Sequence, residues 1–265
     1  MEWIQNIQYN IFLLLTLSAL FGLMIGSFLN VAIYRLPIML QSEWITECTS
    51  FLKDYYSRNQ PQKDVPEYTP EKSMNLAWPS SFCPHCKTPL KLRENIPIIS
   101  FLWQRGRCNH CATKIDWRYP LVEIVCAIAT TITVWEFGVN WICWLALLLT
   151  WSLIVLSFID FEHQILPDNI TLPFLWFGLF LNAFLVFTTP NNAIIGTIAG
   201  YLSLWCVYQL FKFFTGKEGM GYGDFKLMAL LGAWLGWQLL PLIIVLSSFL
   251  GVIIGLSLIL FKGHD

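Results

Sequence analysis

The sequence predicts an all-α, polytopic membrane protein of about seven to eight transmembrane helices with a small polar module outside the membrane. Of its 265 residues, 56% are hydrophobic and only 12% are charged, whereas soluble domains average roughly a quarter charged residues. Twelve of the 16 lysines and arginines lie between Arg35 and Arg118. Long uncharged runs fill the rest of the chain and are typical of helices that cross a bilayer.

Three parts follow from this distribution of charge. Residues 1–34 contain an N-terminal transmembrane helix, residues 35–118 form the polar module, and residues 119–265 form a transmembrane domain. Within the module we expect a short helix near Trp44–Tyr56, followed by a loop around Gln60–Pro66. The first helix is the uncharged run 11–34, and the only charge before it is Glu2. A cleaved signal has a basic start and an apolar core of roughly 7–15 residues, so we expect this helix to remain in the membrane.

The transmembrane domain contains several further spans. A helix needs about 20 apolar residues to cross hydrocarbon. The runs of suitable length are 119–136, 139–159, 169–188 and 192–211. The last apolar stretch, 225–261, is too long for one helix, and we expect a break near Trp237, Gln238 and Pro241. The break would give a short helix followed by a longer final one.

The basic residues predict the orientation of these helices. Cytoplasmic loops are enriched in lysine and arginine, which places the module 35–118 in the cytoplasm and the N-terminus outside. Alternation then puts the loops 160–168 and 212–223 on the cytoplasmic side. Lys212 and Lys217 fall in or beside the second of these loops, although they were not needed to build the topology.

Two Cys-x-x-Cys pairs in the polar module predict a structural zinc site. Their cysteines are Cys83, Cys86, Cys108 and Cys111. Four thiolates complete the tetrahedral shell that zinc prefers and leave no position for a catalytic water. We expect the 21 residues between the pairs to form a hairpin that closes a zinc-ribbon-like site. Iron is the alternative metal, and a cytoplasmic compartment disfavours disulfides.

The other histidines and cysteines are less suited to bind this metal ion. His85 and His110 lie inside the two pairs and are the only substitutes there for a thiolate. The other cysteines have no paired spacing and are interpreted as small packing residues. They are Cys48, Cys126, Cys143 and Cys206.

Two aspartates at the ends of apolar runs predict an intramembrane aspartyl protease. Asp224 ends a glycine-rich loop just before the uncharged run 227–261, and Asp160 ends the uncharged run 137–159. Ionisable groups at this depth cost several kcal/mol unless they are paired, and they usually have a function. The topology places both at the cytoplasmic face. The alternative for Asp224 is a helix N-cap.

The neighbours of the two aspartates support this hypothesis. Gly219, Gly221 and Gly223 let the loop approach a bound peptide closely. Lys226 is either a cytoplasmic anchor or a group that tunes the acid pair. Asp168 is the rival to Asp160, but it stands at the start of a helix, where an N-cap role explains it.

These features together resemble the prepilin peptidases, the type IV leader peptidases of bacterial pilus and type II secretion systems. The resemblance covers nearly the whole chain, with no departure at a motif position. Besides the cysteine pairs and the Gly-x-Gly-Asp loop, it rests on Gly26–Val31, Tyr34–Pro37, Glu94–Pro97, Arg118–Glu123 and Ile159–Asp168.

The resemblance implies two reactions in the bacterial inner membrane. Asp160 and Asp224 would cleave the leader of type IV prepilins and pseudopilins at the cytoplasmic face. S-adenosylmethionine would then methylate the new N-terminal residue, typically phenylalanine. No Gly-x-Gly-x-x-Gly of the soluble methyltransferase type is present. The cytoplasmic module and Glu123 are candidates for holding the cofactor or the amine, and Gly106 is a further candidate for binding the cofactor. The alternatives are an ion pair of Glu123 with Arg118 and a turn at Gly106.

Two other classes of function compete with this interpretation. A transporter would use Asp160 and Asp224 as a proton or cation relay, and a membrane scaffold would use the zinc-ribbon-like module to bind partners. Nucleic acid is not an expected partner, because no basic patch with interleaved aromatic residues is present. The lipid bilayer is an expected partner, and a homo-oligomer is left open.

Overall fold

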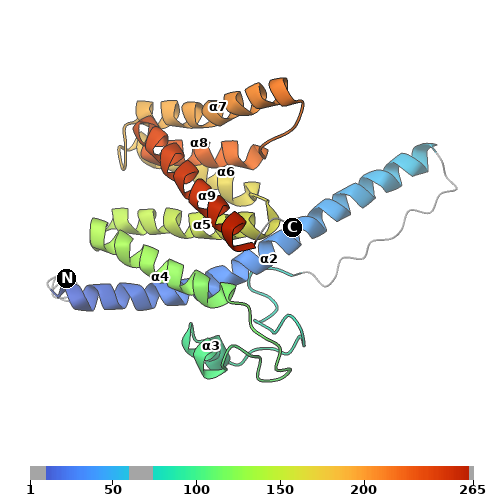
Figure 1. Ribbon diagram of the computed structural model, residues 1–265, viewed down its shortest axis with the longest axis vertical. Helices are drawn as coiled ribbons and strands as arrows, with labels where there is room; N and C mark the ends of the chain where they lie inside the picture. Colours follow the sequence, from blue (N-terminus) through green and yellow to red (C-terminus); the bar gives the residue numbers. More distant parts are fainter. Residues whose placement is uncertain (1–9, 60–73, 263–265) are drawn as a thin grey trace. The chain divides into compact units, whose positions relative to one another are not determined.

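The computed structural model describes residues 10–59 and 74–262, and these residues are mostly helical, with no strand (Figure 1). The predicted all-α fold class is confirmed. The chain forms two compact units, Met1–Ile165 and Leu166–Asp265. The predicted loop around Gln60–Pro66 lies outside the described residues, and the three-part organisation 1–34, 35–118 and 119–265 stays a prediction.

The first unit begins with a helix that is much longer than expected. Helix α2 runs from Ile11 to Asn59, 49 residues, with Pro37 inside it. At 1.5 Å per residue it is about 73 Å long, more than twice the ~30 Å of hydrocarbon. The prediction that the first helix ends near Tyr34 was wrong, and so was the prediction of a separate short helix near Trp44–Tyr56. No glycine or further proline occurs between Pro37 and Asn59, so nothing local stops the helix.

Three helices pack together in this unit: α2, α4 (Arg118–Phe137) and α5 (Trp141–His163). Glycines let α2 approach α4 closely: a Cβ on Gly22 would lie 2.7 Å from the Cα of Ala127, and one on Gly26 would lie 2.7 Å from the Cα of Glu123. Such small-residue contacts replace the hydrophobic driving force that helices lack in lipid. Asn140 caps α5 by accepting the Cys143 N–H.

The second unit consists of α6 (Asp168–Ala183), α7 (Pro190–Thr215), α8 (Tyr222–Leu235), the 3₁₀ turn η2 (Trp237–Leu239) and α9 (Leu240–Lys262). The predicted break near Trp237 is confirmed, at Gly236 with φ 81°. Helices α6 and α8 have 16 and 14 residues, roughly 24 and 21 Å. The predicted span 169–188 was therefore too long.

Asn182 explains why α6 stops early. Its side chain is fully buried. Its Nδ2 donates to the carbonyls of Ala233 and Trp234 at 2.7 and 3.0 Å, and its Oδ1 accepts the N–H groups of Phe187 and Thr188 at 2.9 and 3.0 Å. One amide thus satisfies four backbone groups where α6 and α8 end, and where hydrocarbon offers no partner.

Five helices in the described residues are long and apolar enough to cross a membrane. They are Ile11–Tyr56, Arg118–Phe137, Trp141–His163, Pro190–Thr215 and Trp237–Ser257. The chain is therefore a multi-pass membrane protein. With α6 and α8, which are shorter, the helices correspond one for one to the seven predicted apolar segments.

Helices α7 and α8 meet backbone to backbone through glycines. A Cβ on Gly232 would lie 2.1 Å from the carbonyl oxygen of Gly196, and a Cβ on Gly200 would lie 2.5 Å from that of Met228. Real Cβ atoms do not approach other atoms so closely, so any larger residue must push the two helices apart. These glycines are therefore required by packing and not by backbone conformation.

Gly232→Ala is expected to destabilise the protein by roughly 1–3 kcal/mol, the usual cost of overpacking a close contact. Thermal unfolding in detergent micelles measures the effect as a lower midpoint. Gly255→Ala in α9 is the matched control, because a Cβ there meets nothing within 4 Å. Equal melting temperatures for the two variants would contradict the close α7–α8 contact.

Candidate functional site

The four cysteines of the polar module form one cluster, as predicted. The Sγ atoms of Cys83, Cys86, Cys108 and Cys111 all lie within 4.8 Å of one another. Zn–S bonds of about 2.3 Å in a tetrahedron place sulfurs roughly 3.8 Å apart, and the Sγ atoms of Cys83 and Cys111 are separated by 3.9 Å. Among the described residues neither His85 nor His110 belongs to the cluster.

The two cysteine turns have the same backbone design. The N–H of Cys83 donates to Thr88 O, and the N–H of Cys108 donates to Thr113 O. Each turn contains a residue with positive φ directly after its second cysteine, Lys87 and Ala112, both at 55°. These hairpin turns direct two Sγ atoms from each pair to one point.

The thiols differ in their tendency to ionise. Burial raises the pKa of Cys83 to about 11, while hydrogen bonds with the Thr113 side chain and backbone lower the pKa of Cys111 to about 6. Clustered thiols resist simultaneous ionisation because like charges repel. A divalent cation removes this conflict, so the donor set fits a metal ion.

The residues between the cysteine pairs do not form the predicted hairpin. They contain a 3₁₀ turn, η1 (Leu92–Asn95), and a short helix, α3 (Ile99–Trp103). Glu94 accounts for the difference: its carboxylate accepts the Lys91 N–H and the Asn109 Nδ2–H, both at 2.9 Å. These bonds lower the pKa of Glu94 and connect η1 to the second cysteine turn.

Arg35 joins the module to α2. Only 3% of this arginine is exposed. Its guanidinium donates to the carbonyl oxygens of Asn75, Leu76 and Pro79, in the segment just before the first cysteine turn. Three carbonyls thus satisfy most of the arginine donors, which explains why a buried cation is tolerated here.

A cavity of about 410 Å³ lies between α2, the start of α4 and the module. This volume is within the range of small-molecule sites. Glu123, a predicted cofactor candidate, lines it and accepts the Ile98 N–H at 2.7 Å. Arg118 pairs with Glu162 and not with Glu123. Gly106 does not line the cavity; it has φ 67°, and a Cβ there would lie 3.2 Å from the Phe101 ring.

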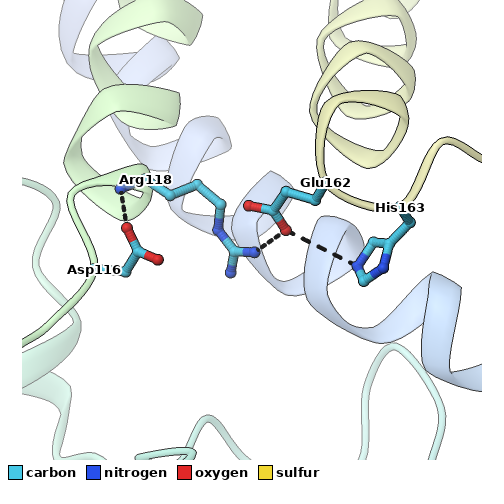
Figure 2. A network of polar contacts seen from close by, with 4 residues as sticks. All are labelled: Asp116, Arg118, Glu162 and His163. Atoms are coloured by element: carbon cyan, nitrogen blue, oxygen red, sulfur yellow. Dashed lines mark hydrogen bonds and ion pairs between the residues drawn. The ribbon is translucent and has the colours of Figure 1, made fainter. Parts of the chain in front are cut away.

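Asp160 lies half-buried in the last turn of α5. Figure 2 shows the polar contacts that follow it: Arg118, at the start of α4, reaches Glu162, whose carboxylate also lies 3.9 Å from His163 Nε2. The ion pair fixes the end of α5 beside the start of α4. The module and the loop after Asp160 therefore lie at the same end of this unit, as the topology requires.

Asp224 lies half-buried in the first turn of α8, after the N-cap Gly221. Two residues later, Lys226 Nζ donates to both carboxylate oxygens of Asp168 at 2.8 Å. Asp168 is the first residue of α6, whose N-cap Pro167 has no side-chain cap hydrogen bond. The expected N-cap role for Asp168 was wrong, because its carboxylate is bound to Lys226.

The loop glycines have different surroundings. A Cβ on Gly219 would lie 2.8 Å from the Phe211 ring, and one on Gly223 would lie 2.8 Å from the Leu166 side chain. Gly221 has nothing within 4 Å of such a Cβ. Packing therefore requires glycine at two of the positions, and the approach of a peptide to this loop stays a prediction.

The structure brings some predicted site residues together and leaves others in separate units. The four cysteines meet, whereas Asp160 belongs to the first unit and Asp224 to the second, so the acid pair stays a prediction. Of the other cysteines, Cys126 and Cys143 are buried as expected of packing residues. Cys48 and Cys206 are exposed, which corrects that interpretation.

Sequence reasoning missed two residues of the first unit. Asn30 and Arg35 are buried polar side chains in α2, and they were noted only as parts of motifs. The available signal was a polar residue and a charge near the end of an apolar run, which usually mark a function or a specific partner.

Comparisons with known proteins assign most of the chain. Residues 20–137 match the bacterial peptidase A24 N-terminal domain, and residues 147–256 match the type IV leader peptidase family. Relatives named prepilin leader peptidase/N-methyltransferase are 50% identical in Aeromonas hydrophila, 46% in Pseudomonas aeruginosa and 44% in Neisseria gonorrhoeae. Each alignment covers 94% of this chain and 82% or 83% of the relative.

No solved structure matches the chain. The two family models together extend from the first transmembrane helix to the last one. The resemblance drawn from the cysteine pairs and the Gly-x-Gly-Asp loop is thereby confirmed. The chain belongs to the type IV leader peptidase family.

Proposed function

We propose that this chain removes the leader peptide of type IV prepilins and type II secretion pseudopilins and then N-methylates the new N-terminal residue. The observation that carries the proposal is the match over 94% of the chain to relatives whose name states both activities. The chain is accordingly an aspartic endopeptidase with a second, methyltransferase activity. A transporter or a scaffold is not favoured, since neither explains these relatives.

Asp160 and Asp224 form the catalytic pair in this proposal. Support comes from contacts within each unit. Arg118–Glu162 places the loop after Asp160 at the module's end of the first unit, and Asp168–Lys226 places the start of α6 beside the first turn of α8. The loop 160–168 takes part in both pairings. A prepilin leaves its leader in the cytoplasm, so its scissile bond lies at the cytoplasmic boundary of the membrane. The predicted topology places both aspartates at this boundary.

Hydrolysis by two carboxylates needs one ionised and one protonated at the same time. Two carboxylates held close together cannot both ionise cheaply, so they share a proton. The ionised aspartate takes a proton from the attacking water, and the protonated one donates a hydrogen bond to the scissile carbonyl. A proton then passes to the leaving amine. Because the two carboxylates titrate as a unit, the roles of proton acceptor and hydrogen-bond donor are properties of the pair and not of either aspartate alone.

Asp160→Asn and Asp224→Asn are each expected to lower leader cleavage by roughly 10²–10⁴-fold, the usual contribution of a general acid or base. An amide cannot accept the water proton or complete the shared-proton pair. The measurement is cleavage of a prepilin by the purified protein in detergent, with melting temperature as the test of folding.

Asp168→Asn is the matched control. It removes only a partly exposed ion pair with Lys226, and such pairs contribute about 0–1 kcal/mol. We expect less than a tenfold loss of cleavage. Normal cleavage by the Asp160 variant together with loss in the Asp168 variant would move the first catalytic position to Asp168.

The cysteine cluster binds one structural zinc ion in this proposal. The four Sγ atoms within 4.8 Å of one another support it, as does the absence of any other ligand group in the cluster among the described residues. Zinc would neutralise the thiolates and hold the two turns together. Because four thiolates fill its shell, it takes no part in the hydrolysis.

Elemental analysis is expected to find about one zinc per chain. Cys86→Ser should lose the metal and lower the melting temperature, because a closed structural site contributes its binding free energy to folding. Cys206→Ser is the control, since Cys206 is an exposed residue outside the cluster. Iron in place of zinc, or full metal retention in Cys86→Ser, would contradict the assignment.

S-adenosylmethionine is the methyl donor in this proposal, and the cavity of the first unit is the site of methyl transfer. The donor supplies a methyl group bonded to a positively charged sulfur. The cavity's volume and its acidic Glu123 suit a cationic small molecule or a cationic substrate end. Helices α2 and α4 and the cysteine module would hold the reacting groups and exclude bulk water.

A further inference from the structure

Two buried hydrogen-bond acceptors lie in the cavity of the first unit. Asn30 is 4% exposed and Glu123 is 7% exposed, and both line the cavity. Asn30 Nδ2 donates to Tyr119 O at 3.0 Å, but its Oδ1 has no partner among the described residues. A buried acceptor without a partner is unfavourable, so a ligand that donates a hydrogen bond there would be favoured.

Glu123 adds a carboxylate beside this amide. It lies five residues after Arg118, about 7.5 Å further along α4. One carboxylate oxygen accepts the Ile98 N–H at 2.7 Å. The Ser27 side chain also hydrogen-bonds to Glu123. Two uncharged donors do not neutralise a carboxylate at this depth, where an ionisable group needs a partner of opposite charge.

The cationic residues that line the cavity are occupied elsewhere or lie at its outer edge. Arg35 donates to three backbone carbonyls of the module. Arg118 pairs with Glu162 through Nη1, and its buried Nε has no partner among the described residues. Lys114 is exposed and forms a backbone β-bridge with Arg107. No lysine or arginine among the described residues of the cavity lining is therefore paired with Glu123, and a cationic ligand would supply the complementary charge.

We propose that Glu123 and Asn30 receive the free α-ammonium group of the cleaved pilin and hold it for methylation. This inference rests on the proposed function. An ammonium group offers three donors and one positive charge, which suits one carboxylate and one unpartnered amide oxygen. After cleavage the pilin's N-terminus stands at the head of a membrane helix, and Glu123 lies in the first turns of a membrane helix.

The two residues would also prepare the amine for reaction. An ammonium has no lone pair, so it must lose a proton, which the Glu123 carboxylate accepts. The amine nitrogen then forms a bond to the methyl carbon while the carbon–sulfur bond breaks and its electron pair stays on sulfur. The product is a methylated ammonium, and the proton on Glu123 leaves to solvent.

Peptide binding without any methyl donor tests the inference. The probe is a fluorescent peptide with the apolar N-terminal sequence of a mature pilin, beginning with phenylalanine, free or N-acetylated. The wild type is expected to prefer the free amine by roughly tenfold to a hundredfold, as for hydrogen bonds between charged groups. Glu123→Gln should abolish most of this preference, and Asn30→Ala should reduce it by a smaller factor.

Glu123→Gln separates this role from a structural one. Glutamine still has a carbonyl oxygen for the Ile98 N–H but carries no charge. A purely structural role therefore predicts no change in peptide preference, and that result would overturn the proposal. Glu136→Gln, an exposed carboxylate on the same helix, is the matched control and should keep the full preference.

Further measurements distinguish the pilin amine from S-adenosylmethionine as the ligand of Glu123 and Asn30. If Glu123→Gln weakens binding of S-adenosylmethionine and leaves the peptide preference intact, the acceptors serve the donor's own amino group and the proposal is wrong. With saturating peptide, we expect the variant's methylation rate to fall as well, because the proton acceptor is gone. A wild type that cleaves but never methylates would instead remove the proposed methyltransferase function itself.

Discussion

Hydrocarbon offers no hydrogen bonds, and this constraint determines how each unit is built. Every backbone group at a helix end inside the membrane needs a partner within the protein. Asn182 meets that need for four backbone groups at the ends of α6 and α8. Glycines at the α7–α8 contact let the helices approach until their backbones touch. Among the described residues, Asn182 and Arg35 have backbone partners, and Asn30 and Glu123 have a proposed ligand.

The same constraint separates the two proposed chemistries. Peptide hydrolysis needs acids at the boundary where the scissile bond meets water, and Asp160 and Asp224 both lie half-buried at helix ends. Methyl transfer needs a site that limits access of water, and the cavity is lined by the buried Asn30 of α2 and Glu123 of α4. Residues of the cysteine turns also line the cavity, and Arg35 joins the module to α2.

The sequence was sufficient for the features that depend on local pattern. Hydrophobic runs predicted the helices, Pro241 and the Trp237–Gln238 pair predicted the break, and cysteine spacing predicted the cluster. It was insufficient where distant residues decide the outcome. The early end of α6 depends on hydrogen bonds between Asn182 and α8, and the Ile98–Glu123 bond joins residues 25 apart. The unbroken α2 shows that one proline does not end a helix when no glycine or second proline follows it before Asn59.

Crosslinking in membranes tests whether Asp160 and Asp224 form one catalytic pair. Cysteines would replace both aspartates, with Cys48 and Cys206 changed to serine, and a short bifunctional thiol reagent would be added. If the two aspartates form the pair, mass spectrometry will find a crosslinked peptide that joins positions 160 and 224. If this pair fails while cysteines at positions 168 and 224 crosslink readily, Asp160 is not the partner of Asp224.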